Sequence, residues 1–348
     1  MAAWRVELEG IMRFGFWKKL KKPFFALAPM LDVTDVAFRE MFAKYAPPDV
    51  FWTEFVSCDG LCSSGKEKLL PMLEYTERQR PIVAQIFGAN PEHFYRTAIL
   101  VKELGFDGID INMGCPDRAV ERQGAGCALI TAPKLAQKIV LETKRGAGRL
   151  PVSVKTRLGF NRDTMEEWLP YLFEVEPAAI SIHARTRKEM SKVPARWDRI
   201  TDAVALRDGY FSLPAGRQGG TRSKPFIIGN GDVASLEEAE EKAFETGADG
   251  VMIGRGIFGN PWFFSRSARV PAPKKKLSAL LEHTVLFEKW FGNSNLDRPS
   301  SKKNFDIMKK HFKAYVSGFD GAKELRMKLM EAKSSKDVHA ILKDEGYL

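Results

Sequence analysis

The sequence has few of the residues that build covalently or metal-stabilised folds: 4 cysteines and 5 histidines among 348 residues. Four thiols are too few for a disulfide scaffold. Cys58 and Cys62 lie close together, but no second Cys/His pair is placed to complete a zinc site. We therefore interpret both as ordinary thiols and predict no metal.

Long apolar runs are also missing, since no stretch of 18 or more apolar residues occurs. A membrane span is therefore not expected. Near the start of the chain Glu7 and Glu9 interrupt an apolar scatter, and the lysines at 18–22 follow this scatter instead of preceding it. That order is wrong for a secretory signal. We expect a cytoplasmic protein.

The charge that is present is unevenly distributed. The chain is 44% hydrophobic and 28% charged, which suits a sizeable core, and its net charge is +10. Residues 265–348 hold 18 Lys and Arg against 10 Asp and Glu, whereas the middle of the chain is close to neutral. A basic C-terminal segment suggests a polyanionic partner, but charge alone favours the alternative of a solvated lysine-rich surface.

Short apolar runs alternate with helical patterns between about residues 24 and 260. The runs are rich in Val, Ile and Phe and lack alternation, as parallel strands buried on both faces do. Helical patterns cover 91–104, 132–145, 164–175 and 235–246. This predicts an α/β fold, a (β/α)₈ TIM barrel. An open doubly wound sheet is the alternative, but no strand is followed by a GxGxxG fingerprint. The eight predicted strands are Phe24–Ala28, Phe51–Phe55, Ile82–Phe87, Gly108–Asn112, Val152–Thr156, Ala179–His183, Phe226–Gly229 and Gly250–Gly254.

Strand patterns stop after Pro261 while helical patterns continue. The run 271–276 resembles a linker. We predict an N-terminal extension over 1–22, a catalytic barrel over 23–268 and a small all-α C-terminal domain over 274–348. The irregular stretch 212–223 is expected to be a surface loop.

Polar groups stand at the carboxyl ends of six predicted strands, where barrel enzymes place their active sites. Loops after strands seven and eight frequently bind phosphate in such barrels. Glycine backbone amides there would approach an anion, and Arg255 would add a bidentate donor. Lys155 would hold negative charge on a reduced flavin ring, and Gln85 would contact its polar edge. These groups suit FMN, and they suit another phosphorylated ligand equally well. The strand-end groups are Gln85, Asn112, Lys155, His183, Asn230-Gly231-Asp232 and Gly254-Arg255-Gly256.

Cys115 follows the fourth predicted strand within Asn112-Met113-Gly114-Cys115-Pro116. Gly114 permits a tight turn and Pro116 stiffens the loop. A thiol in this place can donate a proton if it is neutral or attack if it is ionised. The alternative is a small buried hydrophobe, which is how we interpret Cys127.

At these residues the sequence resembles the tRNA-dihydrouridine synthase family. The Asn-Met-Gly-Cys-Pro segment, followed by Gly124-Ala125-Gly126, is the most specific part. The resemblance continues into the helical region at 318–322 and covers nearly all of the chain after about residue 24. The other segments that carry it are Ala28-Pro29-Met30, Gln85, Lys155-Thr156-Arg157, His183-Ala184-Arg185-Thr186-Arg187, Asn230-Gly231-Asp232, Gly254-Arg255 and Asn260-Pro261-Trp262.

The resemblance implies an FMN-bound barrel and a helical domain that together bind tRNA. It implies that flavin reduced by NADPH or NADH passes hydride to C6 of a uridine, while Cys115 supplies the proton to C5. Asn112 would hold the uracil, and Arg185 and Arg187 would approach the RNA. The residues implied for FMN are Pro29, Met30, Gln85, Lys155, His183, Asn230, Gly231, Asp232, Gly254 and Arg255.

The basic helical region would bind the RNA backbone, through Lys309, Lys310 and Lys313 among others. We expect a monomer. Two other interpretations stay open from the sequence. One is an FMN barrel oxidoreductase that acts on a small pyrimidine or enone. The other is a tRNA-binding folding aid whose reductase activity is incidental.

Overall fold

The structure is a computed structural model that describes residues 14–212, 224–266, 271–292 and 303–348. Most of the predicted N-terminal extension and nearly all of the predicted loop at 212–223 lie outside these residues. Within them, no helix combines the length and the hydropathy that a membrane span requires.

Eight parallel strands form one sheet in the order β1-β8-β7-β6-β5-β4-β3-β2. An isolated parallel bridge between Ala26 and Val50 joins the two outer strands. The predicted barrel is confirmed, and the strands agree with the predicted ones to within one or two residues. They are β1 (Phe24–Leu27), β2 (Phe51–Ser57), β3 (Ile82–Phe87), β4 (Gly108–Asn112), β5 (Val152–Arg157), β6 (Ala179–His183), β7 (Phe226–Asn230) and β8 (Gly250–Ile253).

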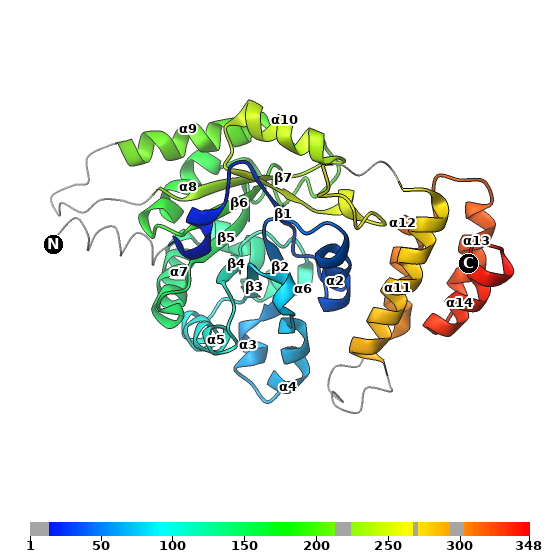
Figure 1. Ribbon diagram of the computed structural model, residues 1–348. Helices are drawn as coiled ribbons and strands as arrows, with labels where there is room; N and C mark the ends of the chain where they lie inside the picture. The colour runs from blue at the N-terminus through cyan, green and yellow to red at the C-terminus, as the bar shows by residue number, and fades with distance from the viewer. Residues whose placement is uncertain (1–13, 213–223, 267–270, 293–302) are drawn as a thin grey trace.

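Helices between the strands surround the sheet (Figure 1). Residues at the helix starts explain where these helices begin. Asp35 and Ser235 each accept a hydrogen bond from the backbone amide three residues further on, and Pro91 occupies the first turn of its helix. The four helices predicted from the sequence are confirmed. The main helices are α2 (Val36–Tyr45), α5 (Pro91–Glu103), α7 (Pro133–Ala147), α8 (Met165–Glu174), α9 (Asp198–Ser212) and α10 (Leu236–Thr246), with the short α3 (Cys58–Leu61), α4 (Lys66–Leu69) and α6 (Arg118–Arg122).

Aromatic side chains fill the amino-terminal end of the barrel. Trp17, on the 3₁₀ helix η1 (Gly15–Lys19), is 1% exposed. Its ring centroid lies 5.6 Å from that of Phe24, 5.8 Å from that of Trp52 and 6.2 Å from that of Phe226. The segment just before β1 therefore closes this end of the barrel.

Further along the strands the barrel interior becomes polar. Gln85, Asp110 and Ser153 are paired in register on β3, β4 and β5, and all three are buried. Lys155 is paired with Ser181 on β6. Side chains on a strand alternate between its two faces, so polar residues two positions apart, such as Ser153 and Lys155, share a face. These polar positions support the site above them.

The C-terminal region is helical and packs against α2 beside the barrel (Figure 1). Its elements are α11 (Pro273–Phe291), η7 (Phe305–Met308), α12 (Lys309–Tyr315), α13 (Ala322–Met330) and α14 (Ser335–Asp344). The linker predicted at 271–276 is wrong over 273–276, because Pro273 begins α11, and proline is favoured at the first position of a helix. The domain boundaries at 22, 268 and 274 stay predictions.

Ion pairs join the helical region to the barrel. The Lys303 ammonium lies 2.9 Å from a carboxylate oxygen of Glu54 and 3.8 Å from one of Asp35. Glu54 also accepts a hydrogen bond of 2.6 Å from the backbone N–H of Asp32. The Lys310 ammonium donates to the carbonyl of Asp32 at 2.8 Å. The helical region thus holds the loop between β1 and α2.

Candidate active site

A cavity of about 570 Å³ opens at the carboxyl ends of the strands. Its size is typical of a pocket for a cofactor or small ligand. All ten residues predicted to bind FMN line it, together with Asn112, Cys115 and Arg185. The lining residues are Ala28, Pro29, Met30, Phe55, Gln85, Asn112, Gly114, Cys115, Pro116, Lys155, Arg157, His183, Arg185, Ser191, Asn230, Gly231, Asp232, Val233, Ala234, Met252, Gly254, Arg255 and Gly256.

The pocket is electropositive. The Lys155 ammonium donates to the side-chain oxygen of Asn230 at 3.0 Å. Burial, reinforced by the neighbouring Arg157 guanidinium, lowers the pKa of Lys155 to about 8. Burial and the same cations lower the pKa of His183, so that its imidazole is neutral at physiological pH. Burial thus disfavours positive charge on Lys155 and His183, and a bound anion would stabilise it.

The loops after β7 and β8 form the rim. Gly231 has φ of +135°, and a Cβ added there would lie 2.8 Å from the Cβ of Ala195. A Cβ on Gly256 would lie 2.1 Å from the carbonyl oxygen of Val233. Gly231 is therefore required by its positive φ and by the Ala195 methyl group, and Gly256 by the close approach of the Val233 backbone.

Two arginines flank a carboxylate at this rim. Asp232 pairs with the buried Arg185, and its other carboxylate oxygen lies 3.4 Å from Arg255. The side chain of Arg255 is 63% exposed. Asp232 thus orients both guanidinium groups, and Arg255 keeps donors available for a ligand.

Hydrogen bonds to its backbone groups hold the Cys115 loop in place. The side-chain oxygen of Asn112 accepts from the N–H groups of Gly114 at 3.1 Å and of Cys115 at 2.9 Å. Arg157 donates to the carbonyl of Gly114 at 2.7 Å, and the N–H of Cys127 donates to the carbonyl of Cys115 at 3.1 Å. Burial raises the pKa of the Cys115 thiol, which favours a neutral proton donor over a thiolate nucleophile.

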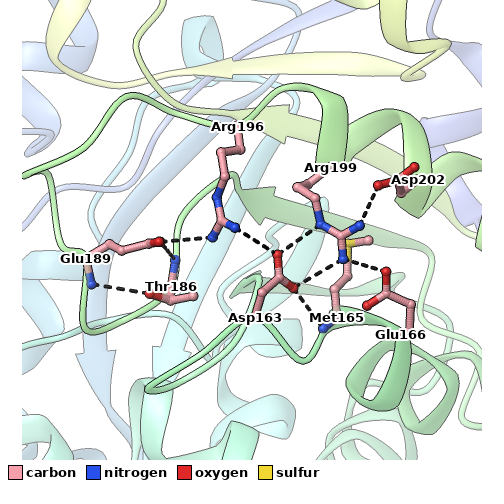
Figure 2. Close-up of polar contacts among 8 residues, drawn as sticks. All are labelled: Asp163, Met165, Glu166, Thr186, Glu189, Arg196, Arg199 and Asp202. Carbon is pink, nitrogen blue, oxygen red and sulfur yellow. Dashed lines mark hydrogen bonds and ion pairs between the residues drawn. The ribbon is translucent and has the colours of Figure 1, made fainter.

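A network of ion pairs fixes the loop between β6 and α9, which carries the lining residue Ser191 (Figure 2). Arg196 lies 3.2 Å from Asp163 and 3.0 Å from Glu189. Arg199, in the first turn of α9, lies 2.9 Å from Asp163, which precedes α8. The network joins the β5–α8 loop to the β6–α9 loop, and the β6–α9 loop contributes Arg185 and Ser191 to the pocket lining.

Four predicted substrate-binding residues do not line the cavity. Arg187 pairs with Glu121 on α6, with its Nε 2.7 Å from the carboxylate. Lys309 pairs with Asp306 at 2.6 Å, Lys310 donates to the Asp32 carbonyl, and Lys313 is exposed on α12. Their roles in RNA binding stay predictions.

Several residues of the site were not predicted. Arg157 and Phe55 line the pocket, and Asp110 lies beneath it with Ser153. Arg157 lies two residues after Lys155, and Asp110 lies two residues before Asn112, so each shares a strand face with a predicted site residue. This spacing was the sequence signal that could have identified them. No group of three or more His, Cys, Asp and Glu residues suited to a metal occurs in the part of the chain that the structure describes.

The fold and the pocket define a (β/α)₈-barrel enzyme with a cationic active site at the carboxyl ends of its strands. The family model of dihydrouridine synthase (Dus) matches residues 26–208 and 221–346. The chain belongs to the dihydrouridine synthase family, as predicted.

Relatives agree along nearly the whole length. The chain is 41% identical over 333 residues to a probable tRNA-dihydrouridine synthase of Staphylococcus aureus (strain COL), covering 95% of each chain. It is 41% identical to a probable tRNA-dihydrouridine synthase 2 of Bacillus subtilis (strain 168), covering 96% of this chain and 97% of that one. Histamine dehydrogenase from Rhizobium sp. 4-9 aligns with a TM-score of 0.51 at 12% identity, over 75% of this chain and 48% of that chain, a likeness of fold alone.

Proposed function

We propose that this protein reduces a uridine of tRNA to dihydrouridine, with FMN bound in the barrel pocket and Cys115 as the proton donor. The observation that carries the proposal is one pocket that contains a thiol with a raised pKa and a lysine with a depressed one, in a member of this family. The relatives named above are called tRNA-dihydrouridine synthases, which supports tRNA as the substrate.

The donor set fits FMN. Lys155 supplies positive charge where a reduced flavin ring would carry negative charge, and Arg255 with the glycine amides of the rim suits a phosphate. When bound and reduced by NADPH or NADH, FMN supplies the hydride. The residues proposed to hold it are Pro29, Met30, Gln85, Lys155, His183, Asn230, Gly231, Asp232, Gly254 and Arg255.

The thiol of Cys115 would deliver the proton. Uracil C5=C6 is conjugated to a carbonyl, so hydride addition at C6 creates negative charge that must be protonated at C5. A positioned acid accelerates such a step by typically about 10²–10⁴-fold. Because burial raises the pKa of Cys115, its thiol stays protonated at neutral pH and is available as that acid.

The substrate base would reach the pocket only after it leaves the RNA stack. We propose that Asn112 holds the extruded uracil and that the basic helical region, through Lys309, Lys310 and Lys313, binds the phosphate backbone. Arg185 is buried against Asp232, so it would act on the pocket, whereas Arg187 lies outside the lining. A tRNA substrate agrees with the cytoplasmic location expected from the sequence.

The reaction is tested by mass spectrometry of nucleosides from unmodified tRNA incubated with the holoprotein and NADPH. We expect uridine to gain the mass of two hydrogens. The Cys115→Ala variant should keep its flavin and tRNA affinity but lose turnover by about 10²-fold or more. The matched control is Cys127→Ala, which removes a buried thiol near the same loop and should retain turnover.

Full turnover by Cys115→Ala would remove this thiol from the mechanism. No mass gain from a wild-type protein that holds reducible flavin would contradict tRNA as the substrate. A free pyrimidine or enone would then be the substrate to test.

A further inference from the structure

A chain of hydrogen bonds runs from Ser153 on β5, below the pocket, through the lining residues Gln85 and Asn112 to the Cys115 loop. The Ser153 hydroxyl donates to one carboxylate oxygen of Asp110 at 2.5 Å, and the Gln85 amide nitrogen donates to the other at 2.7 Å. The Asn112 amide nitrogen donates to the Gln85 side-chain oxygen at 3.1 Å. The oxygen of Asn112 then accepts from the backbone N–H groups of Gly114 and Cys115.

The four side chains of this hydrogen-bond chain differ in their relation to the cavity. Gln85 and Asn112 line the cavity, whereas Asp110 and Ser153 do not. All four side chains are at most 5% exposed. Asp110 is therefore placed to act on a ligand through its neighbours and not by contact.

The chemistry at the two ends of the chain fixes its direction. An ionised carboxylate only accepts hydrogen bonds, and a backbone N–H only donates. Gln85 must therefore turn its nitrogen toward Asp110 and its oxygen toward Asn112. Asn112 must turn its nitrogen toward Gln85 and its oxygen toward the Cys115 loop. Turning either carboxamide over would bring two donors or two acceptors face to face.

Asp110 is ionised at neutral pH. Burial raises its pKa to about 6, and the hydrogen bonds from Gln85 and Ser153, together with the charge of Lys155, oppose that rise. The carboxylate can thus serve as the fixed acceptor at the start of the chain.

We propose that Asp110 is a positioning residue that fixes the donor–acceptor direction of Gln85 and, together with the backbone N–H groups of the Cys115 loop, makes Asn112 present an N–H donor to the pyrimidine. The inference rests on the proposed function. One hydrogen of the Asn112 amide is taken by Gln85, which leaves the other for a ligand. A donor suits a ring carbonyl of uracil, whereas an exocyclic amino group in its place would meet a donor.

The Asn112→Asp variant tests the direction. The introduced carboxylate keeps an acceptor for the Gly114 and Cys115 amides but opposes a second acceptor against the Gln85 oxygen. Gln85 can relieve this only by turning over, which then faces its oxygen toward Asp110. At alkaline pH, where the introduced carboxylate is ionised, we expect the Tm of the holoprotein to fall by several degrees and turnover to fall about tenfold or more.

The double variant Asp110→Asn with Asn112→Asp provides the decisive measurement. An amide at position 110 can donate to a reversed Gln85 and still accept from the Ser153 hydroxyl. The reversed chain is then satisfied throughout, so most of the lost Tm should return. Turnover should not return, because position 112 now offers the pyrimidine carbonyl only acceptors.

Two single variants serve as controls. In Asp110→Asn alone the backbone N–H groups of Gly114 and Cys115 still orient Asn112, and the Ser153 hydroxyl can turn to accept from the new amide, so turnover and Tm should fall less than in Asn112→Asp. Ser153→Ala removes one bond to Asp110 without changing the direction, and it should not rescue Asn112→Asp.

Losses of Tm that simply add in the double variant would overturn the proposal. So would an Asp110→Asn variant as inactive as Asn112→Asp, since that result would assign the effect to the charge of Asp110. Thermal unfolding needs no substrate, so this outcome is separate from a failure of the proposed function, which would show as a wild-type protein that does not reduce uridine.

Discussion

The two ends of the barrel are built from the same eight strands but have opposite chemistry. At the amino end, inward side chains such as Phe24 and Trp52 pack around Trp17. At the carboxyl end, inward side chains such as Lys155 and His183 line an electropositive pocket. The change takes place within single strands, as in β7, which begins with a phenylalanine and ends with an asparagine.

The side chains that stabilise the fold and the side chains that form the site therefore lie at opposite ends of the barrel. Burial of an aromatic side chain is favourable, whereas burial of a cation without a partner is costly. The depressed pKa of Lys155 reflects that cost, whereas His183 avoids it by staying neutral. The closed end therefore stabilises a fold whose open end is destabilised until an anionic ligand binds.

The largest effect on stability is expected at the closed end. Trp17→Ala should lower the free energy of unfolding by about 3–5 kcal/mol, because the side chain is 1% exposed and four aromatic rings lose a partner. Denaturant unfolding measures this loss. Flavin affinity of the folded fraction should not change, since the pocket lies at the other end of the strands.

Phe16→Ala is the matched control for this variant. Its ring stacks on Trp17 at 4.7 Å but is only partly buried, so a smaller loss is expected. If Trp17→Ala lost flavin affinity as steeply as stability, the two ends would not be separable.

The second expected effect is at the open end, where Lys155→Met should stabilise the flavin-free protein by on the order of 1–3 kcal/mol at neutral pH. The folded-state pKa of Lys155, about 8, lies below its ordinary value of 10.5, so the folded protein binds this proton less tightly than the unfolded chain. Wild-type stability should therefore rise as pH increases from about 8 toward 10.5, and the variant should lack this rise.

Flavin affinity should change in the opposite direction, because Lys155→Met removes the cation that a reduced ring requires. Unfolding curves across alkaline pH and a flavin titration measure the two effects. Lys102→Met, an exposed lysine on α5, is the control and should change neither. A variant that is less stable at neutral pH would contradict the assigned cost.

The same comparison shows what the sequence could predict. Uninterrupted apolar runs identified all eight strands, and polar residues at strand ends identified most of the pocket, because both signals are local. Asp110 and Ser153 were missed although they lie two positions before Asn112 and Lys155. Within an apolar run their polarity becomes informative only once the barrel shows that they face inward.

The helical region was harder to interpret for another reason. The sequence shows only that this region is rich in lysine, whereas packing gives the individual lysines different contacts. Lys303 is held by Glu54, and Lys310 binds the Asp32 carbonyl in the loop that carries Pro29 and Met30. Which lysine faces solvent depends on how α12 packs against the barrel, and charge counts do not contain that information.

The smallest expected effect separates these tasks. Lys313 is exposed, so Lys313→Glu should weaken tRNA binding by less than about tenfold and reduce the slope of log affinity against log salt by about 0.7–0.9 for the lost phosphate contact. Lys138→Glu is the matched control, because Lys138 is also exposed and lies on α7, across the barrel from the helical region (Figure 1). Binding isotherms at several salt concentrations measure both. In contrast to these two variants, Lys310→Glu should lower flavin affinity as well as tRNA affinity, since it releases the Asp32 loop. Equal losses in the Lys313 and Lys138 variants would mean that net charge, and not the helical surface, attracts the RNA.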